Sequence, residues 1–272
     1  MKTTIITHLQ AGESKSERQP ERNYEQHGFD FLRNCISLDR INRIRTEILW
    51  LSGMLGGPAD ACSIDEAWNF FKVQDRRAGA LIYNAFKRLP AVHSLCAQDS
   101  LIAEIKKITG FALPAILDVN CRIDSQGEER YLFDWHQDYW FSVSSTNALV
   151  VWIPLEKVDE ETGGIELYTS EDTQHKILKT SSGIEYNTYA DAVRLAEDLP
   201  TGPTISTFMD PGDALLFKFN ILHRSKPVLS KNRSRFTIQF RYADFADPQF
   251  IANEYKPGIV TNTKTSYFNI GK

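Results

Sequence analysis

The sequence predicts an α+β fold that is mainly β, in which helices come first and pack against a closed double sheet. Three observations support this prediction. Apolar residues recur at helical spacing over about residues 36–110, short runs with strand character follow over about 114–245, and neither a repeat nor an obvious linker interrupts the chain after residue 30. Helices followed by many short strands favour a sandwich or barrel that the helices buttress.

The helical segment contains several apolar stripes with recognisable ends. Residues 38–55 place a large apolar side chain every three or four positions, and Gly56 stops the run. Residues 63–66 have the form of a capping box, which opens a second helix. Further stripes cover residues 81–89 and 101–108 and are followed by proline and by glycine. We therefore expect helices to fill most of this segment.

The second part of the chain has the texture of a sheet. Short runs rich in β-branched and aromatic residues are separated by turn residues, which is typical of strands. These runs cover residues 148–153, 205–208, 214–219 and 235–240. Residues 181–201 form a polar, partly helical insertion between two of these strand-like runs. We expect an insertion of this length and composition to form a lid.

The first residues differ in composition from the rest. Residues 10–26 are rich in Glu, Ser, Arg and Gln and nearly free of large apolar groups, so they contribute little to a core. We expect residues 1–26 to form a mobile arm and residues 27–272 to form a single domain.

The composition excludes several classes of protein. A net charge of −4 and a pI near 5.9 argue against nucleic acid as a partner, because phosphate contacts need a concentrated basic surface. No apolar run approaches membrane length, and polar residues interrupt the start too early for a signal peptide. The cysteines form no C-x-x-C pair, so we expect buried, reduced thiols in a soluble cytoplasmic protein. A small molecule is the expected partner, and the oligomeric state is not predicted.

One segment, Trp135 to Tyr139, and a distant histidine suggest a metal site. On a strand, His136 and Asp138 would share a face while Gln137 points away. His223, which follows an apolar strand, can complete a face of two imidazoles and one carboxylate. This arrangement leaves the other coordination positions open and is typical of non-haem Fe(II) oxygenases. The alternative is that the three are unrelated polar residues at sheet edges.

An iron centre with three protein ligands needs a co-substrate that supplies electrons, and 2-oxoglutarate does so. Its far carboxylate needs a cation, for which the planar guanidinium of arginine is the best match. Arg235 is the candidate, because a hairpin from His223 into the next strand would bring both side chains into one cavity. Arg233 shares the face of Arg235 and is its rival, and Arg241 lies further along that face.

Several motifs in the same part of the chain can be compared with a known family. They are Trp135-His136-Gln137-Asp138, Val151-Trp152-Ile153-Pro154-Leu155 with Glu161-Thr162-Gly163-Gly164, Pro211-Gly212-Asp213-Ala214-Leu215-Leu216-Phe217, His223-Arg224-Ser225, and Arg235 with Arg241-Tyr242. With these motifs the chain resembles, over about residues 25–245, the phytanoyl-CoA dioxygenase family of Fe(II)- and 2-oxoglutarate-dependent oxygenases.

The resemblance implies a double-stranded β-helix, a jelly-roll of the cupin type, wrapped by N-terminal helices. It implies that iron is held by the predicted triad and that Arg235 anchors 2-oxoglutarate. Ser225 corresponds to a serine that helps to hold the same carboxylate, and Trp152 to an aromatic residue of the co-substrate pocket. Residues 168–172 depart from the family pattern, in which a Pro-Gly-Ser-His turn is common. That departure concerns the substrate side.

Further residues are candidates for lining the cavity. Asp134 and Trp140 would share the ligand face if their strand stays regular, and Tyr139 is adjacent. Asn120 and Arg122, which alternate on the preceding strand, are candidates for contact with co-substrate or substrate. The alternative for both is ordinary sheet surface.

The expected reaction is hydroxylation of an unactivated C–H bond of a small molecule, with release of succinate and carbon dioxide. Halogenation is disfavoured, because iron halogenases of similar fold have a small residue where this chain has Asp138. Two alternatives remain. One is a cupin-like metalloenzyme that does not use 2-oxoglutarate, and the other is a non-enzymatic β-sandwich binding module.

Overall fold

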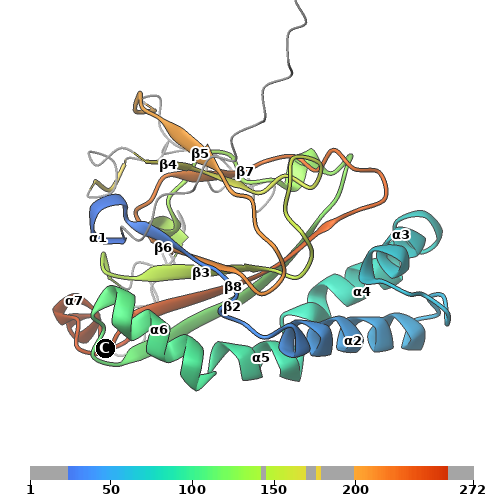
Figure 1. Cartoon of the computed structure of the whole chain (residues 1–272), viewed down its shortest axis with the longest axis horizontal. Coiled ribbons are helices and arrows are strands. Elements are labelled where there is room, and N and C mark those ends of the chain that lie inside the picture. The colour runs from blue at the N-terminus through green and yellow to red at the C-terminus, as the bar shows by residue number, and fades with distance from the viewer. Residues whose placement is uncertain (1–23, 142–144, 170–175, 179–198, 257–272) are drawn as a thin grey trace, which may run out of the picture.

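Two facing β-sheets and a layer of helices make up the described part of the chain (Figure 1). The computed structural model describes residues 24–141, 145–169, 176–178 and 199–256. The helices are α1 (Tyr24–His27), α2 (Leu38–Met54), α3 (Ile64–Gln74), α4 (Arg76–Phe86), α5 (Pro90–Cys96), α6 (Asp99–Thr109) and α7 (Pro248–Ala252), with 3₁₀ turns η1 (Glu129–Tyr131) and η2 (Asp138–Phe141). The strands are β1 (Phe29–Leu32), β2 (Pro114–Asp124), β3 (Leu149–Pro154), β4 (Ile165–Tyr168), β5 (Thr204–Ser206), β6 (Ala214–Lys218), β7 (His223–Ser225) and β8 (Arg235–Asp244).

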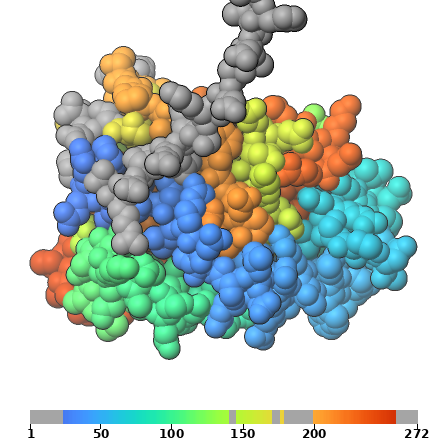
Figure 2. Space-filling model, in the orientation of Figure 1, coloured from blue at the N-terminus to red at the C-terminus, as the bar shows by residue number. Residues whose placement is uncertain are grey.

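The two sheets are antiparallel and differ in size. The larger has the order β1-β6-β3-β8-β2, and the smaller has the order β5-β4-β7. The smaller sheet lies over one face of the larger, and the helical segment α2 to α6 covers the opposite face (Figure 1). Figure 2 shows this helical segment, in blue to green, as the lower surface of the molecule in the same view. The predicted α+β layout with a helix-buttressed double sheet is confirmed.

Strand β8 shows why the larger sheet is buried on both faces. Phe236, Ile238 and Phe240 alternate along it and belong to the apolar core beneath the helices. The residues between them, beginning with Arg235 and ending with Arg241, point to the other side, into the space between the sheets. The interior of the sandwich therefore carries charged side chains along one strand, and these need partners inside the protein.

The predicted helices form largely where the apolar stripes placed them. In α2 the stripe Ile41, Ile44 and Ile48 is buried against the core. Oγ of Ser63 accepts a hydrogen bond from the amide of Glu66 at 3.1 Å, which is the predicted N-cap of α3. The structure adds helix α5, which the apolar stripes do not predict, since a proline after residues 81–89 favours the end of a helix. Proline is also well suited to the first position of a helix, where its missing N–H is not needed.

Several other expectations need correction or lie outside the described residues. Helical structure already begins at Tyr24, before the predicted domain start at residue 27, and the Tyr24 side chain is buried.

All the cysteines are free thiols, but Cys62 is exposed, contrary to the expectation of burial. Residues 1–23 of the predicted arm and residues 181–198 of the predicted lid lie outside the described residues. None of the helices that the structure describes is long and apolar enough to cross a membrane.

Gly163 gives a test of the packing between the β3–β4 connection and the segment that follows β7. Its φ is +56°, and a Cβ there would lie 2.4 Å from the carbonyl oxygen of Pro227. We expect Gly163→Ala to lower the free energy of unfolding by about 1–3 kcal/mol more than the left-handed backbone alone explains. Urea denaturation measures this difference.

The matched control is Gly127→Ala. Gly127 also has a positive φ, +81°, but a Cβ there would meet no atom within 4 Å. We expect Gly127→Ala to lower the free energy of unfolding only by the cost of the left-handed backbone, about 1–2 kcal/mol. Equal losses in the two variants would show that the close approach at Gly163 is not rigid.

Candidate metal centre

The two predicted histidine ligands are held side by side by reciprocal backbone hydrogen bonds. The amide of each donates to the carbonyl of the other, and both N···O distances are 2.9 Å. This contact between His136 and His223 is an isolated bridge, so the regular strand that we expected around His136 is absent from this described segment. Asp138 instead begins the 3₁₀ turn η2. Chain curvature after the bridge, and not strand alternation, places the carboxylate near the histidines.

The three predicted ligands converge on one point. A donor atom from each of His136, Asp138 and His223 lies within 4.8 Å of the other two. Nε2 of His136 is 3.7 Å from Oδ1 of Asp138, and the centroids of the two imidazole rings are 4.0 Å apart. All three side chains are buried. The arrangement has the composition and proximity that a divalent metal ion requires.

Backbone carbonyls orient both imidazole rings. Nδ1 of His136 lies 2.7 Å from the carbonyl oxygen of Asp134, and Nδ1 of His223 lies 3.0 Å from that of Ile221. A carbonyl oxygen can only accept, so each Nδ1 carries the proton and each Nε2 keeps its lone pair. Hydrogen bonds of this kind fix the tautomer of metal-binding histidines in proteins.

Burial keeps both histidines neutral. It lowers the pKa of His136 to about 3, with the neighbouring His223 as the next cause. It also lowers the pKa of His223. A metal ion binds only the neutral imidazole, so near neutral pH the site need not release protons from these rings before it binds an ion.

Asp138 is ionised and held by an arginine. Burial opposes its ionisation, but the positive charge and the hydrogen bonds of Arg241 outweigh burial and lower the pKa of the carboxyl. Nη2 and Nε of Arg241 donate to Oδ2 of Asp138 at 3.1 and 3.3 Å, and Nη1 donates to Asp118 at 3.0 Å. Oδ1 is the oxygen that lies near His136. Arg241 therefore orients the carboxylate and leaves one oxygen towards the site.

Three of the predicted co-substrate residues line the pocket that contains the triad. They are Asn120, Trp152 and Ser225. The other lining residues are Phe133, Ile165, Phe217, Gln239 and Arg241. Phe133 and Gln239 were not predicted from the sequence. Gln239 lies on the same face of β8 as Arg235, so alternation along this strand could have identified it. The enclosed space is about 20 Å³, which is close to the volume of one water molecule.

Arg235 does not line this pocket, although it lies on the inward face of β8. Its guanidinium is buried, and its Nε and Nη2 donate to Asp124 at 3.2 and 2.9 Å. Nη1 donates to the carbonyl oxygens of Thr162, Gly164 and Lys226. Because Lys226 directly follows β7, this cluster lies just beyond the lining residue Ser225.

The expected hairpin between β7 and β8 is wrong. β7 pairs with β4 in the smaller sheet, whereas β8 pairs with β2 and β3 in the larger sheet. The connection between β7 and β8 therefore crosses between the layers, and it carries Arg233. Nη1 of Arg233 donates to Asp159 at 2.8 Å, and its side chain is partly exposed.

The predicted substrate residues lie in different places. The side chain of Asp134 is exposed, and it lines a neighbouring open pocket together with Phe133 and Ser225. Tyr139 is half-buried and packs against the core between the sheets. Arg122 lies over the ring of Phe133 at 4.6 Å but lines a different cavity. The Trp140 side chain lies outside the described residues.

With the geometry established, the chain can be compared with known proteins. Residues 24–237 match the family model described as Phytanoyl-CoA dioxygenase (PhyH). The chain belongs to the phytanoyl-CoA dioxygenase family. The predicted resemblance is thereby confirmed, and the matched residues include the whole triad.

Solved structures show the same fold as this family member. SnoN in complex with Fe3+, alpha ketoglutarate and nogalamycin RO is 14% identical, with a TM-score of 0.56 and coverage of 85% of both chains. The carbocyclase SnoK from nogalamycin biosynthesis is 15% identical, with a TM-score of 0.56 and coverage of 81% of both chains. EctD from S. alaskensis is 12% identical, with a TM-score of 0.54 and coverage of 84% of this chain and 78% of its own. The cofactors expected from the sequence agree with those named for SnoN.

The buried histidines of this phytanoyl-CoA dioxygenase family member predict an acid-sensitive metal-free state. Their folded-state pKa values lie below the ordinary 6.5, so the unfolded chain binds more protons as the pH falls. The stability they contribute is complete above about pH 6.5 and is lost towards lower pH. We expect the free energy of unfolding to fall by about 1.4 kcal/mol per pH unit for each histidine.

Urea denaturation of the chelator-treated protein at about pH 6.5 and about pH 5 measures the slope, in a range where ordinary carboxylates stay ionised. His136→Asn should show a shallower slope than the unaltered protein. An unchanged slope would show that His136 does not titrate as its burial requires.

Proposed function

We propose that the protein is an Fe(II)- and 2-oxoglutarate-dependent oxygenase that hydroxylates an unactivated C–H bond of a small molecule. The observation that carries this proposal is the buried convergence of His136, Asp138 and His223. Membership of the phytanoyl-CoA dioxygenase family supports the same class of enzyme. When bound, iron and 2-oxoglutarate supply the oxidising power from dioxygen, with release of succinate and carbon dioxide.

The residues present fit a ferrous ion. Two neutral imidazoles that carry their proton on Nδ1, and one ionised carboxylate, form the donor set of the facial triad. Such a donor set would leave other coordination positions of a bound ion open for the co-substrate and dioxygen. The Arg241 contact fixes the orientation of Asp138 without occupying Oδ1. The protein thus contributes a preformed, buried ligand set.

Among the arginines, Arg235 is best placed to hold the far carboxylate of 2-oxoglutarate. Arg241 is bound to the ligand Asp138, and Arg233 pairs with Asp159 in a partly exposed position. Arg235 is buried next to the segment that follows Ser225, and Nη2 donates only to Asp124 among the described residues. Asp124 thus already pairs with the proposed anchor, and a bound dicarboxylate must share Arg235 with it.

Binding also requires movement. A space of about 20 Å³ admits an ion but not a five-carbon dicarboxylate, so lining side chains must move apart. An adjoining pocket of about 350 Å³ shares Phe133 and Ser225 with the metal pocket and is open to solvent. We place the substrate in this pocket, where the exposed carboxylate of Asp134 can contact it. Phe133, between the two spaces, is the side chain that must move.

The chain's own residues would then exclude water and position the target carbon. Trp152, Ile165 and Phe217 form apolar walls beside the triad. Hydroxylation is preferred to halogenation, because Asp138 occupies the position where a halide would need room. SnoN is described as an epimerase and SnoK as a carbocyclase, so other oxidative outcomes occur on this fold. Product analysis distinguishes them.

Removal of a ligand tests the metal centre directly. His136→Ala or Asp138→Ala should lower anaerobic Fe(II) binding and succinate formation from 2-oxoglutarate by more than about 100-fold, because loss of a ligand exceeds the effect of outer contacts. His93→Ala, an exposed histidine on α5, is the control. Unchanged succinate output in the ligand variants would exclude the assignment.

The same measurements separate the two alternatives. A cupin-like enzyme that does not use 2-oxoglutarate would bind stoichiometric iron through the triad yet produce no succinate with any substrate. A non-enzymatic binding module would bind no stoichiometric iron at all.

A comparison of two arginines tests the co-substrate site. Arg235→Gln should raise the KM for 2-oxoglutarate by roughly 10- to 100-fold, because a hydrogen-bonded charge pair contributes about 1.5–3 kcal/mol. Arg233→Gln, two residues away but paired outside the pocket, should change it little. Circular dichroism at the assay temperature verifies that Arg235→Gln is folded despite the buried Asp124. Equal effects of the two substitutions would contradict the choice of Arg235.

A further inference from the structure

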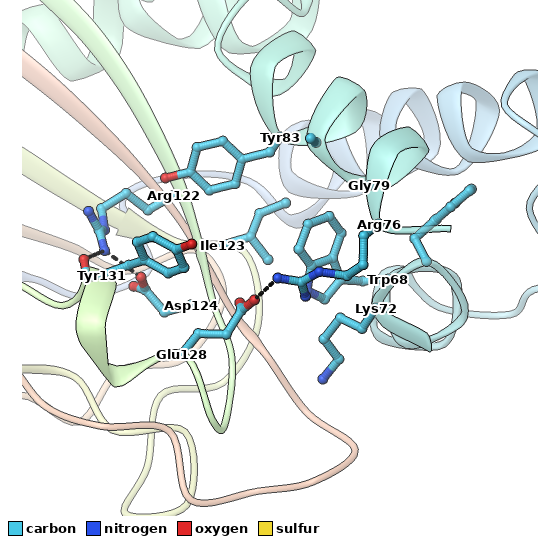
Figure 3. A pocket seen from close by; sticks show the side chains of 12 residues that line it. Trp68, Lys72, Arg76, Gly79, Tyr83, Arg122, Ile123, Asp124, Glu128 and Tyr131 are labelled. Atoms are coloured by element: carbon cyan, nitrogen blue, oxygen red, sulfur yellow. Dashed lines mark hydrogen bonds and ion pairs between the residues drawn. The ribbon is translucent and has the colours of Figure 1, made fainter. Parts of the chain in front are cut away.

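A second cavity lies between the helices and the edge of the larger sheet. It has a volume of about 500 Å³, within the range of sites for small molecules. Its lining comes from α3, α4, the end of β2 and the segment that contains η1, as Figure 3 shows. The lining residues are Trp68, Phe71, Lys72, Arg76, Gly79, Ala80, Tyr83, Arg122, Ile123, Asp124, Glu128 and Tyr131. We call it the helix-edge cavity.

The helix-edge cavity is separate from the metal pocket, since the two share no lining residue. A thin wall divides them. Nη2 of Arg122 donates to Asp124 at 2.6 Å, and the Arg122 guanidinium lies 4.6 Å from the ring of Phe133. Phe133 faces the metal pocket on the other side. The helix-edge cavity is therefore a site in its own right, with an ion pair as its inner wall.

Aromatic carbon dominates the walls. Phe71 and Trp68 are buried, and Tyr83 and Tyr131 add two further rings. Nε1 of Trp68 donates to Oγ of Ser125 at 2.9 Å, so the polar atom of this ring already has a partner. Trp68 therefore contributes ring carbons, and no unpaired polar atom, to the lining of the cavity. Walls of this kind bind flat apolar molecules by stacking and by exclusion of water.

The charged lining has an excess of one cation. Arg76 pairs with Glu128 at 2.6 Å, and Arg122 pairs with Asp124, as the dashed lines in Figure 3 show. Lys72 remains, and its ammonium has no hydrogen bond or ion pair with any described residue. Partial burial lowers the pKa of Lys72, although the carboxylates of Glu128 and Asp65 act in the opposite direction. An anion in the cavity would offset this cost, because an opposite charge favours the charged amine.

We propose that the helix-edge cavity is a second binding site, for a small flat apolar or aromatic molecule that carries an acidic group. The rings of Trp68 and Tyr131 contact its apolar part, and Lys72 binds its acidic group. Figure 3 shows the two rings approaching from the helix side and from the sheet side. This site is additional to the proposed oxygenase function and does not depend on iron or on 2-oxoglutarate.

The first test fills the cavity and uses a fluorescent probe. The probe is 8-anilinonaphthalene-1-sulfonate, an aromatic sulfonate whose emission rises in an apolar site. We expect the full-length protein to bind it saturably and Ala80→Phe to abolish the emission, because Ala80 lines the cavity from an exposed position of α4. Asn84→Phe adds the same ring to an exposed position of α4 outside the cavity and should bind as the unaltered protein does. Equal emission from the two variants would overturn the proposal.

The second test addresses the charge. N-phenyl-1-naphthylamine has the same rings without the sulfonate, so it should bind more weakly than the sulfonate. Lys72→Gln should weaken sulfonate binding by roughly two- to fivefold, the range for a partly exposed ion pair, and leave the neutral probe unchanged. Arg77→Gln, on α4 but outside the cavity, should alter neither probe. If Lys72→Gln left the ratio of the two affinities unchanged, the acidic specificity would be wrong.

Discussion

The reciprocal backbone hydrogen bonds between His136 and His223 are the contact on which the site depends. They attach the segment before η2 to β7, and so they join two parts of the chain that are far apart in sequence. Gln137 reinforces the attachment from the opposite side, where its amide donates to the carbonyls of Asn220 and Lys176 and accepts from Leu178. These contacts fix both imidazoles. To complete the triad, the fold must also orient the carboxylate of Asp138.

The buried charges between the two sheets constrain the structure further, because each needs a partner inside the protein. The inward face of β8 begins with Arg235 and ends with Arg241, and each guanidinium pairs with a buried carboxylate, Asp124 at one end and Asp138 at the other. Removal of one partner from such a pair leaves an uncompensated charge in the interior. The same pairs therefore stabilise the sandwich and shape its sites. Asp138 faces the metal pocket, whereas Asp124, through Arg122, forms the wall of the helix-edge cavity.

Much of this could be predicted from local patterns. Apolar spacing located α2 and α6, the Ser63 cap located the start of α3, and the histidines were recognisable because a carboxylate stands two residues after one of them. Other predictions failed where local patterns do not contain the answer. Alternation along a strand predicted that Asp134 would face the site, but His136 makes only an isolated bridge and a 3₁₀ turn begins at Asp138. Short chain separation suggested a hairpin from β7 to β8, but the two strands belong to different sheets.

The sequence by itself determined the class of the fold, the family and the chemical nature of the metal donors, because these depend on residue type and on periodicity. The tertiary structure decided which charges meet. No spacing along the chain indicates that Arg235 pairs with Asp124, that Arg241 orients Asp138, or that Lys72 and Tyr131 border one cavity. Such pairings depend on the register between β2 and β8 and on how the helices lie against the sheet edge. Long-range packing sets both, and a single sequence does not specify it locally.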